Sequence, residues 1–159
     1  MSNSTTDDIN TLPPIRMTAW DFWKLDSLLK ARADGRSWRA DEILRRELQR
    51  SIIMEESQIP SGVATMRSRV EFRVAGADAT QVATLVYPGE SHMYGDAMSV
   101  LTPFGSAILG LSEGQSIVHA GPDGSSMRLT LLRVLHQPET HSREATRLET
   151  LASAEVETL

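Results

Sequence analysis

The spacing of the hydrophobic positions changes once along the chain, near residue 60. Before that point, apolar residues recur every three or four positions, first over 18–34 and again over 39–54, which predicts two helices. Thr18 is a typical helix cap, with Asp21 three residues further on, and Gly35 is a typical helix end. Because isolated helices of this length are marginal in water, we expect the two to pack on each other as a hairpin.

After residue 60 the period becomes two. Apolar and polar positions alternate from Met66 to Val74, which predicts a strand with one buried face and one largely basic face. Thr102 and Pro103 are typical of a helix start, and Gly110 of its end. Four further strands are predicted at 80–87, 98–101, 115–120 and 127–136. Together these elements predict an α+β domain in which a strongly bent antiparallel sheet holds one short helix.

Charged residues are concentrated in the first part of the chain. Residues 16–56 hold nine Lys/Arg and eight Asp/Glu, or 17 charges in 41 positions, whereas residues 57–139 hold five and seven, or 12 in 83. The first segment is too charged to be a core by itself and the second is sparse enough to be one, so we expect a helical appendage on a compact domain. The predicted parts are a disordered tail at 1–14, a helical hairpin at 15–56, the domain at 60–139, and a flexible or partly helical tail at 140–159.

Composition excludes several kinds of chemistry. The 159 residues contain no cysteine, which excludes disulfides, zinc–thiolate sites and cysteine nucleophiles. The net charge of −5 argues against a general nucleic-acid binder. No segment has the pattern of a membrane span or of a signal peptide, so we expect a cytoplasmic protein with no membrane partner. The four histidines lack metal-ligand spacing, and we assign no catalytic, cofactor-binding or metal-binding residue.

A family resemblance adds to this interpretation. The segment SVLTPFGSAILGLSEG, from Ser99 to Gly114, resembles the signature of the GreA/GreB transcription factors, although Thr102 replaces a serine and Phe104 a smaller aliphatic residue. Blocks that resemble a narrower group, the regulators of nucleoside diphosphate kinase, lie at 59–60, 63–72, 84–88, 121–124 and 137–139. The resemblance implies an FKBP-like domain that carries a short antiparallel coiled coil and binds bacterial RNA polymerase at its secondary channel.

The resemblance also implies which residues dock on the rim of that channel. By position the role falls on one loop, formed by Ser99, Thr102, Pro103, Phe104 and Gly105. The alternative is that this loop only caps and packs the short helix, which would fully explain Thr102 and Pro103. We expect Phe104 to be exposed and regard it as the strongest docking candidate.

The hairpin tip suggests a factor without catalytic carboxylates. Gre factors place acidic side chains near the polymerase magnesium, which requires a long arm and paired oxygen ligands. Here Asp34 is a single acid among arginines, and the helices are much shorter than a Gre arm. We therefore predict no enzymatic role, and competition with Gre-type factors. Trp38 is a candidate anchor for a partner, whereas Trp20 and Trp23 are expected to cover the apolar seam of the hairpin. The candidate tip residues are Asp34, Arg36, Trp38 and Arg39.

Two other partners remain open. The chain could regulate nucleoside diphosphate kinase by direct contact, as the name of the narrower group implies. It could also bind nucleic acid, weakly or indirectly, through a basic strand face formed by Arg67, Arg69 and Arg73. A prolyl isomerase is disfavoured, because a fold does not confer that activity and the domain has few aromatic residues for the pocket.

Overall fold

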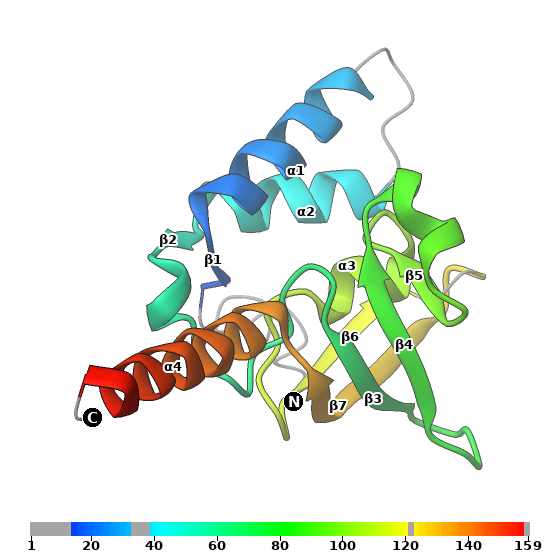
Figure 1. Cartoon of the computed structure of the whole chain (residues 1–159). Helices are drawn as coiled ribbons and strands as arrows, with labels where there is room; N and C mark the ends of the chain where they lie inside the picture. The colour runs from blue at the N-terminus through cyan, green and yellow to red at the C-terminus, as the bar shows by residue number, and fades with distance from the viewer. Residues whose placement is uncertain (1–13, 33–38, 121–122, 158–159) are drawn as a thin grey trace, which may run out of the picture.

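The computed structural model describes residues 14–32, 39–120 and 123–157. It contains a five-stranded mixed sheet, a pair of helices α1 (Ala19–Ala31) and α2 (Arg39–Gln49) on one side of it, and a helix α4 (Pro138–Glu157) that extends away from the body (Figure 1). The predicted α+β class is therefore confirmed. None of the helices in the described part of the chain is long and apolar enough to cross a membrane.

The order of strands in the sheet is β5-β4-β3-β7-β6. The strands are β3 (Arg69–Val74), β4 (Gln81–Val86), β5 (Ala97–Ser99), β6 (Ser116–Ala120) and β7 (Ser126–His136). Neighbours are antiparallel except for β4 and β5, which are parallel. The prediction of an antiparallel sheet is wrong at this edge, because the segment containing the 3-10 helix η3 (Pro88–Met93) brings the chain back to Thr84, within β4, before β5 begins.

Strand β3 has the predicted alternation but begins later than predicted. Val70, Phe72 and Val74 are buried, whereas Arg69 and Arg73 are exposed. The strand does not extend back to Met66, because Arg67 has a φ of 64°, a left-handed conformation that interrupts an extended strand. The pairing with β7 has register shifts, which bend the sheet.

One core lies between the sheet and the short helix α3 (Pro103–Ile108). Phe72, Ile108 and Leu131 are among its fully buried members. Gly110 ends this helical segment, as predicted, with a φ of 85°, and a side chain there would also collide with Ile15. The segment that precedes α1 therefore packs directly on the end of the domain's short helix.

A second core joins the hairpin to the domain. Leu25 and Leu29 of α1 and Leu44 and Leu48 of α2 belong to it, and so do residues on and beside the sheet. These are Met66, Leu85, Tyr87, Val100 and Leu109. The helices pack on each other, as predicted, and on the body as well, so the hairpin shares a core with the domain that follows it.

Two details of the hairpin differ from the prediction. Helix α2 ends at Gln49 rather than at Met54, because Ile52 and Ile53 form strand β2, which pairs in parallel with strand β1 (Arg16–Met17). The second difference is that Trp20 and Trp23 do not cover the seam: they are 61% and 59% exposed, and their ring centroids lie 5.5 Å apart. Leucines fill the seam instead, so the tryptophans lie on the outer face.

Helix α4 begins where β7 ends. The side-chain amide of Gln137 donates to the carbonyl oxygens of Pro60 and Val63, each at 2.8 Å. In the first turn, Glu139 is buried and accepts a hydrogen bond from the hydroxyl of Thr65 at 2.8 Å. The tail that we predicted to be flexible or partly helical is thus a helix over Pro138–Glu157, anchored at its N-terminal end.

Candidate functional site

The loop from Ser99 to Gly105 is held by its own hydrogen bonds. The hydroxyl of Thr102 donates to the carbonyl oxygen of Ser99 at 2.7 Å and accepts from the backbone N–H of Gly105 at 3.1 Å, which caps α3. Pro103 occupies the first turn, where its missing N–H leaves no bond unmade. Gly105 is buried against the backbone of Ser99 and has no room for a side chain. The capping role expected for Thr102 and Pro103 is therefore present, and their role in docking stays a prediction.

Phe104 is half-buried, so it is less available than expected. Its ring packs against Phe72, with centroids 6.3 Å apart, and against the edge of His119 at 5.3 Å. Both ring nitrogens of His119 are buried without a hydrogen-bond partner, and burial lowers the pKa of this imidazole. Phe104 thus packs on a histidine whose protonated form is disfavoured by burial, and only part of the Phe104 surface can contact a partner.

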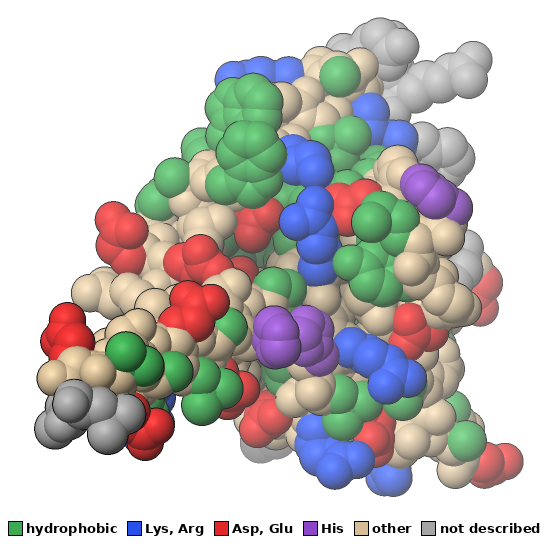
Figure 2. Space-filling model, viewed as in Figure 1, with side chains coloured by type: hydrophobic (Ala, Val, Ile, Leu, Met, Phe, Trp, Pro, Cys, Tyr) green, Lys and Arg blue, Asp and Glu red, His purple; other side chains and the backbone are tan. Residues whose placement is uncertain are grey.

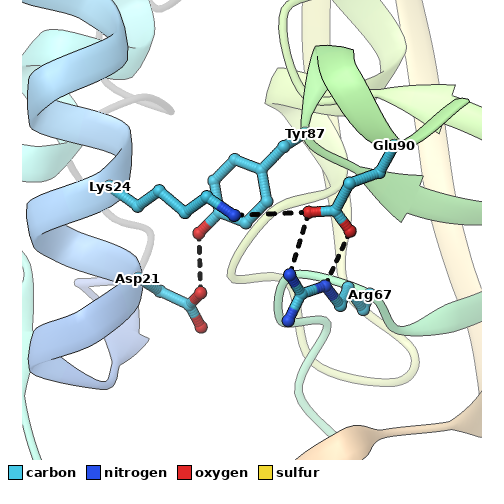
Figure 3. Close-up of polar contacts among 5 residues, drawn as sticks. All are labelled: Asp21, Lys24, Arg67, Tyr87 and Glu90. Atoms are coloured by element: carbon cyan, nitrogen blue, oxygen red, sulfur yellow. Dashed lines mark hydrogen bonds and ion pairs between the residues drawn. The ribbon is translucent and has the colours of Figure 1, made fainter.

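The hairpin is fixed to the body by a cluster of five polar side chains (Figure 3). The hydroxyl of Tyr87 donates to the Asp21 carboxylate at 2.6 Å, and the ammonium of Lys24 lies 4.1 Å from the centre of the Tyr87 ring. Arg67 donates to both oxygens of Glu90, at 2.7 and 2.9 Å, and Lys24 approaches the same carboxylate at 3.5 Å. Two residues of α1 therefore meet three residues of the body, beside the shared apolar core.

Burial and neighbouring groups shift the pKa values of the side chains in this cluster. Desolvation raises the pKa of Asp21, although the hydrogen bond from Tyr87 opposes this effect. Burial and the neighbouring Asp21 raise the pKa of Tyr87, so its hydroxyl keeps its proton and remains a donor. The hydrogen bonds from Arg67 lower the pKa of Glu90. Arg67, the residue with the left-handed backbone, thus directs its guanidinium to this carboxylate.

Acidic partners neutralise two of the three arginines that were predicted to form a basic strand face. Arg67 pairs with Glu90, and Arg69 pairs with Asp96 at 2.8 Å. Figure 2 accordingly shows Lys and Arg side chains next to acidic ones over the centre of this face. The structure brings Arg69 and Arg73 onto one exposed side of β3, with Glu71 between them in sequence. This arrangement gives little support to a nucleic-acid surface, which needs unpaired positive charge.

An open cavity of about 720 Å³ lies between the base of the hairpin and the start of α4. Trp20, Ile53, Met66, Asp21 and Glu139 are among its lining residues. Sequence reasoning identified neither this cavity nor the polar cluster beside it. Glu139 of the cavity and Tyr87 of the cluster nevertheless both lie in blocks that resemble the family. The missing information was spatial, because only the fold brings Asp21 to Tyr87 and Thr65 to Glu139.

Glu139 makes the stability depend on pH in a defined direction. Desolvation raises its pKa in the folded protein, and the hydrogen bond from Thr65 opposes this only in part. A raised folded pKa means that this group's contribution to stability is fully present below its unfolded pKa, about 4.3, and is lost as pH rises through the folded pKa. We therefore expect Glu139→Gln to gain stability relative to the native chain as pH rises from acid to neutral.

Urea unfolding at a series of pH values measures this difference. Glu144→Gln is the matched control, because Glu144 is exposed on the same helix and its replacement removes the same charge. A difference for Glu139→Gln that does not change with pH would contradict the assignment.

The tip candidates lie outside the described residues. Asp34, Arg36 and Trp38 fall in the gap 33–38, and the side chain of Arg39 is likewise not described. Within 14–32, 39–120 and 123–157, no group of three or more His, Asp or Glu residues is arranged to hold a metal ion. The loop and the basic strand face are therefore the predicted sites that the structure describes.

Comparison with known proteins defines the class. Residues 59–136 match the model of the C-terminal domain of the transcription elongation factors GreA/GreB. A solved structure, a GreA/GreB prokaryotic transcription elongation factor from Nitrosomonas europaea, is similar with a TM-score of 0.63 and 34% identity, over 79% of this chain and 100% of that one. The fold and the sequence agree, and the chain belongs to the GreA/GreB family.

Within that family the chain is similar to a particular regulator. It is 36% identical over 127 residues to the "Regulator of nucleoside diphosphate kinase" of Escherichia coli K12, covering 80% of this chain and 93% of that protein. The protein of the same name from Shigella flexneri matches with the same identity and coverage. The predicted resemblance to this group is thereby confirmed.

Proposed function

We propose that this protein is a non-enzymatic transcription regulator that binds bacterial RNA polymerase at the secondary channel. The docking surface is the exposed part of the loop from Ser99 to Gly105, and the hairpin then occupies the channel entrance. There it competes with Gre-type factors and does not stimulate transcript cleavage. The FKBP-like and coiled-coil descriptions of the two parts belong to the same proposal.

The observation that carries the proposal is that a short hairpin packs firmly against the domain that matches the C-terminal domain of GreA/GreB. Helices α1 and α2 have 13 and 11 residues, so the longer one spans about 20 Å. Asp21 is bonded to Tyr87, and the buried Asp41 is paired with Arg32 at 3.0 Å, so neither is presented to a metal ion outside the protein. An arm that is short and fixed favours blocking a channel over reaching a catalytic centre inside it.

Binding is tested with purified core RNA polymerase in a pull-down, with and without an excess of GreA. We expect GreA to displace the protein. Pro103→Glu places a charge on the loop at a position where the helix dipole tolerates it, and we expect about tenfold weaker binding. Thr80→Glu adds the same charge to an exposed position in the β3–β4 connection and should bind normally. This pair is preferable to truncation of Phe104, whose packing on Phe72 is part of the fold.

Transcript cleavage in stalled elongation complexes distinguishes occupancy from catalysis. We expect no stimulation by the protein alone and reduced cleavage when it is added with GreA. Stimulated cleavage would overturn the non-enzymatic assignment. A parallel pull-down with purified nucleoside diphosphate kinase tests the alternative that the name of the relatives suggests: binding to the kinase and not to polymerase would replace the proposal.

A further inference from the structure

The cavity between the base of the hairpin and the start of α4 has an acidic wall. Its carboxylates are those of Asp21, Glu55, Glu56 and Glu139. Arg67 is the one cation among the described residues that line it, and Glu90 already pairs with that guanidinium. With the adjoining groups Glu90, Lys24 and Arg143 included, five carboxylates still face three cations. Figure 2 shows acidic side chains gathered between α1 and α4, so a cationic ligand would complement this wall.

Glu139 lines this cavity as a buried carboxylate without a cation. It is only 4% exposed and accepts a hydrogen bond from Thr65, but no basic group among the described residues lowers its pKa. Desolvation raises the pKa of Glu139, and the neighbouring carboxylates of Asp21 and Glu56 raise it as well. Because carboxylates buried to this extent are normally paired, a cation in the cavity would supply the missing partner.

An aromatic and apolar surface adjoins the acidic wall. Trp20 lines the cavity and is 61% exposed, and Ile53, another lining residue, is 45% exposed. Trp23 contacts Trp20 on the outer face of α1 and extends this surface beyond the cavity. The face of an indole ring attracts cations, and a guanidinium group suits it best because it is planar and weakly hydrated. The surface therefore fits a ligand with a cationic group and an apolar part next to it.

We propose that the cavity binds an arginine side chain from a segment of a partner protein, with an apolar residue of that segment on the tryptophan pair of α1. The guanidinium stacks on the indole of Trp20 and donates to the carboxylates of Glu56 and Glu139. A protein segment fits better than a small free cation, because it also covers the apolar surface outside the cavity. The cavity volume of about 720 Å³ is ample for a side chain together with its flanking backbone.

This site is separate from the loop proposed to dock on polymerase. None of the residues 99–105 is among the described residues that line the cavity. The two surfaces can therefore be tested one at a time, and failure of either proposal would leave the other standing.

Nuclear magnetic resonance titration of the isotope-labelled full chain with the peptide acetyl-Leu-Arg-Leu-amide tests the proposal. We expect saturable shifts of the indole N–H signal of Trp20 and of the backbone amide of Ile53. The same peptide with citrulline in place of arginine keeps the shape but lacks the charge, and should bind about tenfold more weakly. n-Butylguanidinium lacks the apolar flanks and should also bind more weakly. The proposal is overturned if no saturable shift occurs at the cavity, or if either control binds as tightly as the peptide.

Substitutions of exposed lining residues locate the bound arginine. Trp20→Leu keeps an apolar side chain but removes the aromatic face, and Glu56→Gln removes one charge with little change in shape. Each should weaken binding of the peptide by about three- to tenfold, followed by the backbone amide of Ile53. Glu149→Gln removes the same charge from an exposed position of α4 outside the lining, and should bind like the native chain. Native affinity in both lining variants would overturn the proposal, and so would an equal loss in Glu149→Gln.

Discussion

Gly105→Ala is expected to destabilise the folded protein by about 3 kcal/mol or more, a loss typical of severe overpacking. A methyl group at this position would overlap the carbonyl oxygen of Ser99, which is backbone and cannot rotate away. Relief requires α3 to move, and that movement would break the cap from Thr102. The motif glycine is therefore required for packing, whether or not the loop also contacts a partner.

Urea unfolding followed by circular dichroism measures this loss. Gly89→Ala is the matched control: Gly89 lies in η3, has an ordinary backbone conformation, and an added methyl group there would have nothing within 4 Å. We expect its effect to stay within about 0.5 kcal/mol. Equal stability of Gly105→Ala and the native chain would show that the loop relaxes freely, and the steric explanation would then fail.

The local elements were predictable because short-range chemistry determines them. Thr18 caps α1 and Thr102 caps α3 through the side-chain hydrogen bonds that their sequence positions indicated. The alternation of apolar and polar residues likewise predicted that Val70 and Phe72 are buried. These features depend on neighbours a few residues away. A one-dimensional pattern is sufficient for such features.

Prediction failed where distant segments compete for a residue. Ile52 continues the helical stripe of α2 in sequence, but its backbone N–H bonds to the carbonyl oxygen of Ile15 as β2 pairs with β1, which ends the helix earlier. The docking residues are a different case, because their role depends on the surface of another protein, which the sequence of this chain does not encode. Tyr87 and Asp21, 66 positions apart, had no sequence signal that linked them.

The tryptophans of α1 also show that the sequence pattern does not determine which residues the shared core buries. Trp20 and Trp23 have the spacing and size of seam residues, yet Leu25 and Leu29 take that position. The helix can bury only one face, and the shared core selects the leucines, which fit between α2 and the sheet. The largest side chains of the helix are consequently left on its exposed face, where they contact each other.

Leu25→Ala should therefore destabilise the whole chain, by about 3 kcal/mol, rather than loosen the hairpin alone. Leu25 is fully buried in the core that joins the hairpin to the body, and alanine preserves the helix itself. Trp23→Ala removes a larger side chain from the same helix, but that side chain is 59% exposed, so we expect a change within about 0.5 kcal/mol.

The position of the tryptophans makes this prediction decisive. All three lie before residue 39, so their fluorescence reports on the hairpin, whereas circular dichroism reports on the entire chain. Because hairpin and body share one core, both signals should change at the same urea concentration in the native chain, and should shift together in Leu25→Ala. A fluorescence transition that precedes the circular dichroism transition would mean that the hairpin unfolds on its own, and the fixed arm on which the blocking mechanism rests would be lost.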